Sequence, residues 1–174
     1  MQNFKLLSGI FFLAFIFSCQ TPPPEDTNAI IENQLRGMEQ AFRTAPKSIA
    51  NFYADDAVII SADSTLYQGR SVLEDYWANF KRPVDWKLDI LFLSKNENDL
   101  YESDVYIQLP KKPLHWDFTA LDLNEKKELV YQLGHSKLEY ETEDDLYRVS
   151  HVDFILVWEK QANGEYLIIV DTYR

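Results

Sequence analysis

Residues 50–58, ANFYADDAV, mark the point where the helical part of this chain gives way to strands. Ahead of this stretch, Pro46 suits the first position of a short helix, where its missing N–H costs no hydrogen bond. Within it, Asp55 and Asp56 turn the chain into a strand at 57–60. The sequence therefore predicts a helix-to-strand junction here.

Two further helices are predicted on either side of this junction. Thr27 is a suitable N-cap, and the apolar residues that follow it at helical spacing form one stripe: Ile31, Leu35, Met38 and Phe42. Another helix is expected after Gly69-Arg70, because Ser71 and Glu74 have the spacing of a capping box.

The remainder of the chain is predicted to be mostly strand. Apolar and polar residues alternate at 86–93, residues 96–99 indicate a turn, and Asn163-Gly164 is typical of a tight hairpin. Other strands are predicted at 101–109, 129–140, 147–159 and 166–173, whereas 110–127 has no clear pattern. Helices followed by long strands predict an α+β fold, with helices packed on one face of a curved antiparallel sheet.

Four segments together resemble the SnoaL-like and ketosteroid-isomerase-like proteins of the nuclear transport factor 2-like superfamily. They are the junction at 50–58, Gln68-Gly69-Arg70 with the helix that follows, residues 128–134 ending in a glycine, and residues 157–166 around a tryptophan strand and an Asn-Gly turn. The resemblance covers most of residues 28–174 and implies a cone formed by three N-terminal helices over the sheet. It also implies an expected homodimer through the sheet, as in many relatives.

One segment departs from the family pattern. Residues 99–127 are longer than the usual connection between long strands, and they could line, cap or fill the cone. The superfamily contains isomerases, cyclases, dehydratases and proteins without catalysis, so the fold alone does not define an activity.

The first residues predict export. Lys5 precedes an apolar run at 6–17, which is shorter than the roughly 20 residues of a membrane span and has the order of a signal peptide. Ile16-Phe17-Ser18-Cys19 resembles the lipobox of bacterial lipoproteins. We therefore expect a signal peptide at 1–18, a lipid on Cys19, a proline-rich tether at 19–27, and anchoring to the bacterial cell envelope.

Composition excludes several classes of site. The chain has 1 cysteine and a net charge of −11, so an intrachain disulfide is impossible and nucleic acid should be repelled. Glycine-rich phosphate loops, nucleophile elbows and zinc-protease motifs are missing from the sequence. No cofactor or metal is expected.

Three residues form the strongest candidate catalytic cluster. Strand alternation places His151 and Asp153 on one sheet face, and His135 should lie near Asp153 on the preceding strand. A histidine oriented by a carboxylate suits proton transfer next to a carbonyl, and two histidines with an aspartate could also bind a divalent metal. We favour a simpler interpretation over both catalysis and metal binding: these polar residues face solvent or contact a second subunit of a dimer.

A ligand pocket in the cone could draw on residues from several segments. The candidates are Tyr53, Asp56, Tyr76, Trp77, Trp86, Tyr131, His115 and Trp116. Core packing, a turn role for Asp56 or surface packing of the 99–127 segment would account for the same residues without a ligand.

Three functions remain open from the sequence. The leading hypothesis is a lipid-anchored domain that binds a small hydrophobic ligand or has an accessory role, without assigned catalysis. The first alternative is an acid–base enzyme of the isomerase, dehydratase or cyclase type, and the second is a protein-interaction module.

Overall fold

The computed structural model describes residues 26–113 and 128–174. The expected signal peptide, Cys19 and nearly all of the tether lie outside these residues, as do His115 and Trp116. No helix in the described ranges is long and apolar enough to span a membrane.

Helix α1 (Thr27–Thr44) buries the predicted stripe, but it begins one residue earlier than expected. Asp26 is the N-cap, and its carboxylate accepts hydrogen bonds from Asn28 N at 3.1 Å and Ala29 N at 3.4 Å. Thr27 is thus the first helical residue. An aspartate caps as well as a threonine, and its charge also favours the positive end of the helix.

The helix-to-strand junction at 50–58 is confirmed, but the strand begins at Tyr53, so the prediction that Asp55 and Asp56 turn the chain into a strand at 57 is wrong. One arginine holds the junction together. The short 3-10 helix η1 (Pro46–Phe52) leads directly into strand β1 (Tyr53–Ile60). Arg70 donates hydrogen bonds to Ala50 O, Tyr53 O and the Asp55 carboxylate at 2.8, 2.7 and 2.6 Å. The Gly69-Arg70 segment therefore fixes the start of β1, which carries Tyr53 into the core.

Helix α2 (Arg70–Ala78) starts where expected, but the predicted capping box is wrong. Gly69 is the N-cap, with φ of +88° and no side-chain capping bond. Because the helix already begins at Arg70, Ser71 lies inside the first turn rather than before it. Glu74 instead pairs with Lys47 of η1 at 3.0 Å.

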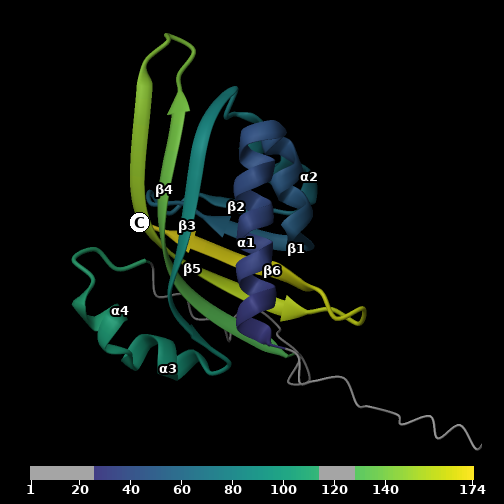
Figure 1. The fold of residues 1–174 in the computed structure, drawn as a ribbon, viewed down its shortest axis with the longest axis vertical. Helices are drawn as coiled ribbons and strands as arrows, with labels where there is room; N and C mark the ends of the chain where they lie inside the picture. Colours follow the sequence, from purple (N-terminus) through teal and green to yellow (C-terminus); the bar gives the residue numbers. More distant parts are fainter. Residues whose placement is uncertain (1–25, 114–127) are drawn as a thin grey trace, which may run out of the picture.

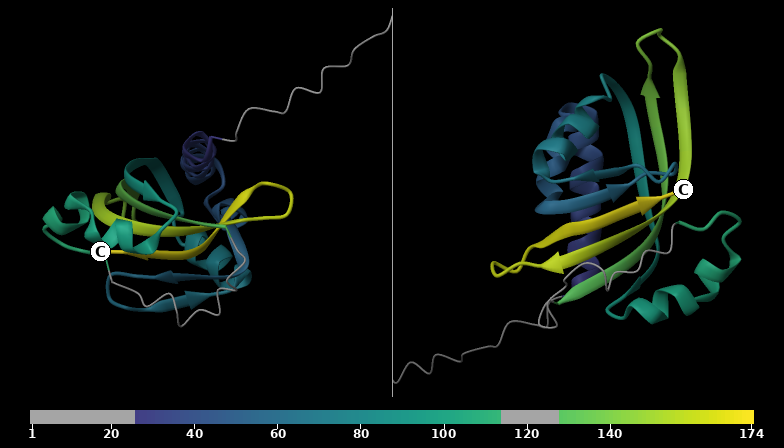
Figure 2. Two further views of the ribbon diagram at one scale, coloured as in Figure 1. Left: turned by 90° about the horizontal axis from the view of Figure 1, so that it is seen from below. Right: turned by 180° about the vertical axis from the view of Figure 1, so that it is seen from behind.

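Six strands form one sheet in the order β2-β1-β6-β5-β4-β3. The remaining strands are β2 (Leu66–Gln68), β3 (Arg82–Ser94), β4 (Leu129–Glu141), β5 (Tyr147–Lys160) and β6 (Tyr166–Tyr173). The expectation of a wholly antiparallel sheet is wrong at one place, since β1 and β6 are parallel. The last strand therefore enters the middle of the sheet, between β1 and β5. The views in Figures 1 and 2 show how strongly the sheet curves.

Both faces of the sheet carry a buried cluster. The concave face packs on α1, η1 and α2, and its core includes Trp86, Phe154 and Trp158. The opposite, outer face has a second cluster containing Ile155 and Val157. The α+β cone is confirmed, and it has a second hydrophobic layer that the sequence pattern did not reveal.

Two short helices, α3 (Glu97–Glu102) and α4 (Asp104–Gln108), contribute to that second layer (Figure 1). The predicted turn at 96–99 and strand at 101–109 are therefore wrong. Asn96 and Ser103 cap the two helices with their side-chain oxygens, and Leu100 and Tyr106 are buried against the outer face. Two apolar residues on which the predicted strand relied, Val105 and Ile107, are exposed on α4. Their alternation with polar residues therefore did not mark one buried face of a strand.

Candidate functional site

A cavity of about 210 Å³ lies between the helices and the concave face of the sheet. Most of its lining is apolar: Met38, Trp77, Phe80, Trp86, Leu88, Leu138, Val152, Phe154 and Leu156. These residues come from α1, α2, β3, β4 and β5, except for Phe80, which lies in the connection between α2 and β3. The cone is thus open inside rather than filled by its own side chains.

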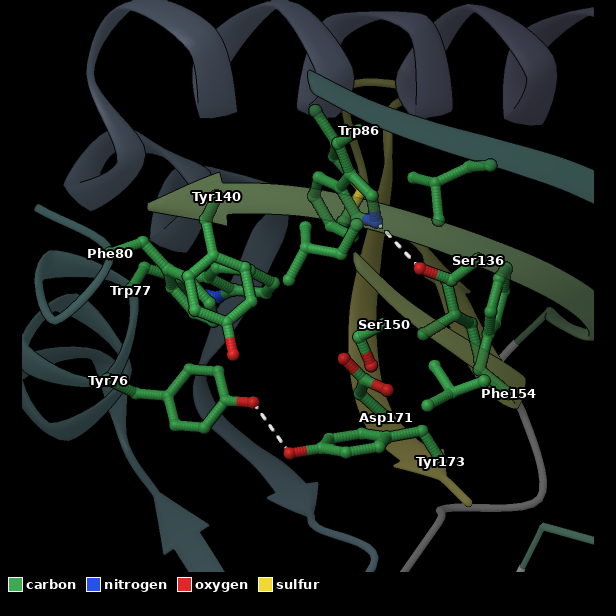
Figure 3. A pocket seen from close by; sticks show the side chains of 15 residues that line it. Tyr76, Trp77, Phe80, Trp86, Ser136, Tyr140, Ser150, Phe154, Asp171 and Tyr173 are labelled. Carbon is green, nitrogen blue, oxygen red and sulfur yellow. Dashed lines mark hydrogen bonds between the residues drawn. The ribbon is translucent and has the colours of Figure 1, made fainter. Parts of the chain in front are cut away.

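Aromatic rings form one wall of the cavity (Figure 3). Trp77 and Trp86 have ring centroids 5.0 Å apart, and Phe80 meets Tyr140 edge-on at 5.3 Å. Such contacts restrict each ring to one orientation. The wall is a rigid apolar surface against which a flat molecule could pack.

Asp171 of β6 is the one carboxyl group in the lining. It is 8% exposed, and its Oδ2 accepts a hydrogen bond from the buried hydroxyl of Tyr53 at 2.7 Å. Burial raises the pKa of Asp171 from its usual 3.8 to about 7, because the charged form loses its hydration; the Tyr53 hydrogen bond acts in the opposite direction. Asp171 can therefore hold or release a proton near neutral pH.

Three tyrosines and two serines complete the polar part of the lining: Tyr76, Tyr140, Tyr173, Ser136 and Ser150. Tyr76 and Tyr173 share a hydrogen bond of 2.7 Å (Figure 3), and burial raises the pKa of both phenols. Ser136 Oγ accepts the indole N–H of Trp86 at 2.8 Å, and Ser150 also faces the cavity. Tyr76, Tyr173 and Ser150 lie near Asp171, whereas Ser136 and Tyr140 lie on the side of the aromatic wall (Figure 3).

The predicted ligand-pocket residues divide into five groups. Tyr76, Trp77 and Trp86 line the cavity, and Tyr53 lies behind it through its bond to Asp171. Asp56 is exposed on β1. Tyr131 belongs to the outer-face cluster and so does not line the cone. His115 and Trp116 lie outside the described residues.

The predicted cluster of His135, His151 and Asp153 does form. His135 Nδ1 is 2.9 Å from Asp153 Oδ1, and His135 Nε2 is 3.4 Å from His151 Nδ1. It lies on the outer face, however, because the cavity uses the alternate residues of β5, among them Ser150 and Val152. A ligand inside the cone would not touch these three side chains.

Sequence reasoning missed the residues that give the cavity its polar character. Asp171 is the clearest case. The sequence does contain a signal for it, because Asp171 directly follows the apolar run 167–170 in the last predicted strand. A lone carboxyl group in a buried strand is costly unless its proton or a partner compensates. Its neighbour two residues on, Tyr173, shares the same face of β6 and was missed with it.

Comparisons with known proteins identify the fold. No protein-family model matches the chain, and no curated protein matches it. A ketosteroid isomerase-like protein from Erwinia carotovora atroseptica is 13% identical, with a TM-score of 0.53 over 82% of this chain and 91% of that one. A protein from Catenulispora acidiphila, solved in complex with S-DNPA, is 12% identical, with a TM-score of 0.54 over 84% and 90%.

A third solved structure shows the same architecture. It is a nuclear transport factor 2-like protein from Novosphingobium aromaticivorans, 6% identical, with a TM-score of 0.56 over 84% of this chain and 79% of that one. The TM-scores establish the shared fold, whereas sequence identities this low leave the activity open. The described chain has the α+β cone fold of the nuclear transport factor 2-like superfamily.

Proposed function

We propose that the cone binds one small, mainly apolar molecule whose polar group meets Asp171. The observation that carries this proposal is an open apolar cavity with a single buried carboxyl group among its lining residues. At about 210 Å³, the cavity is smaller than the roughly 300–1,000 Å³ of drug-sized sites. The ligand is accordingly a small one.

We also infer from the lining how such a molecule lies. Its apolar body packs on the wall formed by Trp77 and Trp86, and a carbonyl or hydroxyl oxygen accepts a hydrogen bond from protonated Asp171. An apolar ligand removes the remaining water from this carboxyl group and so favours its neutral form. Binding should therefore be tighter below the pKa of about 7 than above it.

Two structural neighbours are consistent with this proposal by their names. One is described as ketosteroid isomerase-like, and another is a complex with S-DNPA. Both concern other proteins at low identity, so the lining residues of this chain carry the argument.

Two substitutions on the same strand test the cavity. We expect Val152→Trp, which fills the cavity, to weaken binding of the neutral fluorescent alcohol 1-naphthol by at least about tenfold, a loss of about 1.4 kcal/mol. Val149→Trp is the matched control, because Val149 is 45% exposed and lies on the other face of β5. Fluorescence titration measures both, with circular dichroism to confirm folding. Equal affinity in the two variants would show that the probe does not enter the cone.

Acid–base catalysis is a second candidate, supported by the raised pKa of Asp171. A carboxyl group with a pKa of about 7 exchanges protons efficiently at neutral pH. In this function Asp171 would move a proton at a carbon next to a ligand carbonyl, while Tyr76 or Tyr173 would donate a hydrogen bond to the oxygen. Nuclear magnetic resonance would follow deuterium exchange at that carbon in small cyclic ketones. Exchange that persists unchanged in Asp171→Asn would exclude this role.

We also propose that the mature chain is anchored by a lipid on Cys19, on the basis of its lipobox-like sequence. Intact-mass spectrometry of membrane-extracted protein should find a diacylglyceryl-modified Cys19 at the N-terminus. The Cys19→Ala variant should instead leave the detergent phase during phase partitioning. An unmodified Cys19 in the membrane-extracted protein would contradict the anchor.

A further inference from the structure

The outer face of the sheet carries the histidine pair described above, and the cone does not use it. His135 on β4 and His151 on β5 are diagonal neighbours, since His135 is directly opposite Asp153 and His151 directly opposite Lys137. Their rings are stacked, with centroids 5.6 Å apart and planes inclined by 26°. The His135 side chain is 37% exposed, so an ion from solvent can reach the pair.

The spacing of the two facing nitrogens matches a metal site. Zinc held tetrahedrally by imidazoles, at about 2.0–2.1 Å from each nitrogen, keeps two ligand nitrogens about 3.3–3.4 Å apart. The distance from His135 Nε2 to His151 Nδ1 is 3.4 Å. A zinc ion beside these atoms could contact both without movement of the strands.

Asp153 orients the first of these ligands. Its carboxylate accepts a hydrogen bond, so at 2.9 Å it holds the hydrogen of His135 on Nδ1 and leaves the lone pair on Nε2. The same carboxylate–histidine arrangement supports zinc ligands in many proteins. Without metal, His151 Nδ1–H donates to that lone pair; with metal, the hydrogen of His151 is carried on Nε2 and both facing nitrogens bind the ion.

Acidic and basic residues both lie around the pair, and Arg174 is opposite Asp153 through two backbone hydrogen bonds. Asp89 lies directly opposite His135 on β3. The nearest cation by register, Lys137, forms an ion pair with Glu139 at 2.5 Å, which offsets its charge. The chain as a whole carries −11.

We propose that His135 and His151 bind a divalent transition-metal ion on the outer sheet face, with Asp153 as a positioning residue. Imidazole ligands select zinc, copper or nickel over calcium or magnesium, which prefer oxygen. In the described ranges, no group of three or more histidine, cysteine or acidic side chains is placed so that it could hold a metal ion. The site therefore supplies two protein ligands and leaves the other coordination positions to water or to a second molecule.

Calorimetric titration with zinc chloride tests this site. The full chain is used in detergent after treatment with a chelator, and every sample carries Cys19→Ser so that the single thiol cannot bind metal. We expect one zinc ion per chain and no response to calcium. His135→Gln and His151→Gln should each weaken zinc binding by at least about tenfold, and Asp153→Asn by about 10–100-fold, as for other residues that orient a ligand.

His115→Gln is the matched control, because it removes the third and last histidine of the chain. Its zinc affinity should equal that of the parent. The proposal is overturned if the parent binds no zinc, or if the His135→Gln/His151→Gln double variant binds zinc as tightly as the parent. Because these side chains are outside both hydrophobic clusters, the variants should fold, and circular dichroism checks this.

Discussion

Asp171→Asn should make the protein more stable at and above neutral pH, although it removes a carboxyl group from a hydrogen bond. The pKa of Asp171 is raised in the folded protein from 3.8 to about 7. Between these values the unfolded chain loses the proton while the folded chain retains it, so unfolding is increasingly favoured as the pH rises. The stabilisation of the folded state by protonated Asp171 is fully present below about pH 4 and is lost once the pH rises above about 7. At about 1.4 kcal/mol per pKa unit it amounts to about 4 kcal/mol.

Asparagine resembles the protonated carboxyl group in shape, and its oxygen can still accept the hydroxyl of Tyr53. The variant should therefore match the parent near pH 4 and exceed it by up to about 4 kcal/mol near pH 8. Urea unfolding over this pH range measures the difference. Asp56→Asn controls for the loss of one negative charge at an exposed position. Parallel stability curves for Asp171→Asn and the parent would contradict the raised pKa.

Trp86→Ala should lower the free energy of unfolding by about 3–5 kcal/mol, the usual range for removing a buried tryptophan. Trp86 of β3 is 6% exposed and contacts three other elements. Its ring meets Phe42 of α1 at 5.7 Å and Trp77 of α2 at 5.0 Å, while its N–H donates a hydrogen bond to Ser136 of β4. The truncation would also enlarge the cavity and leave Ser136 without this partner.

Trp86→Phe separates the two effects. It keeps an aromatic ring between the helices and removes the hydrogen bond, so its cost should be about 1–2 kcal/mol. Urea unfolding followed by circular dichroism compares the variants. If both substitutions lower the free energy of unfolding equally, packing of the ring at position 86 does not stabilise the contact between the helices and the sheet.

Much of the fold could be predicted because most elements have one buried face. The stripe of α1 repeats with the helical period, and the Asn163-Gly164 turn separates two strands as expected. The segment 97–108 could not be predicted in this way. Its helices are too short to display a full period, and their caps, Asn96 and Ser103, are equally common in turns.

The site was harder to predict because both faces of β5 are apolar over half its length. Phe154 and Leu156 face the cone, while Ile155 and Val157 face the outer cluster. Since α3 and α4 bury part of the outer face, hydrophobicity does not distinguish inside from outside on this strand. The alternation of side chains along β5 could therefore place His151 and Asp153 on the same face. It could not show that the cavity lies on the opposite face of the sheet.

The central position of β6 also has a consequence for how the protein is made. This strand is synthesised after the other described strands, yet β1, made more than a hundred residues earlier, pairs with it along Val58↔Val170 and Ile60↔Thr172. A nascent chain that ends before Tyr166 can assemble the β3-β4-β5 meander but cannot join β1 to it. Closing so long a loop is entropically costly and slow. Until β6 is made, its partner strands must be kept from pairing with other molecules, so the cone and its buried Asp171 can form only after residues 166–173 have been synthesised.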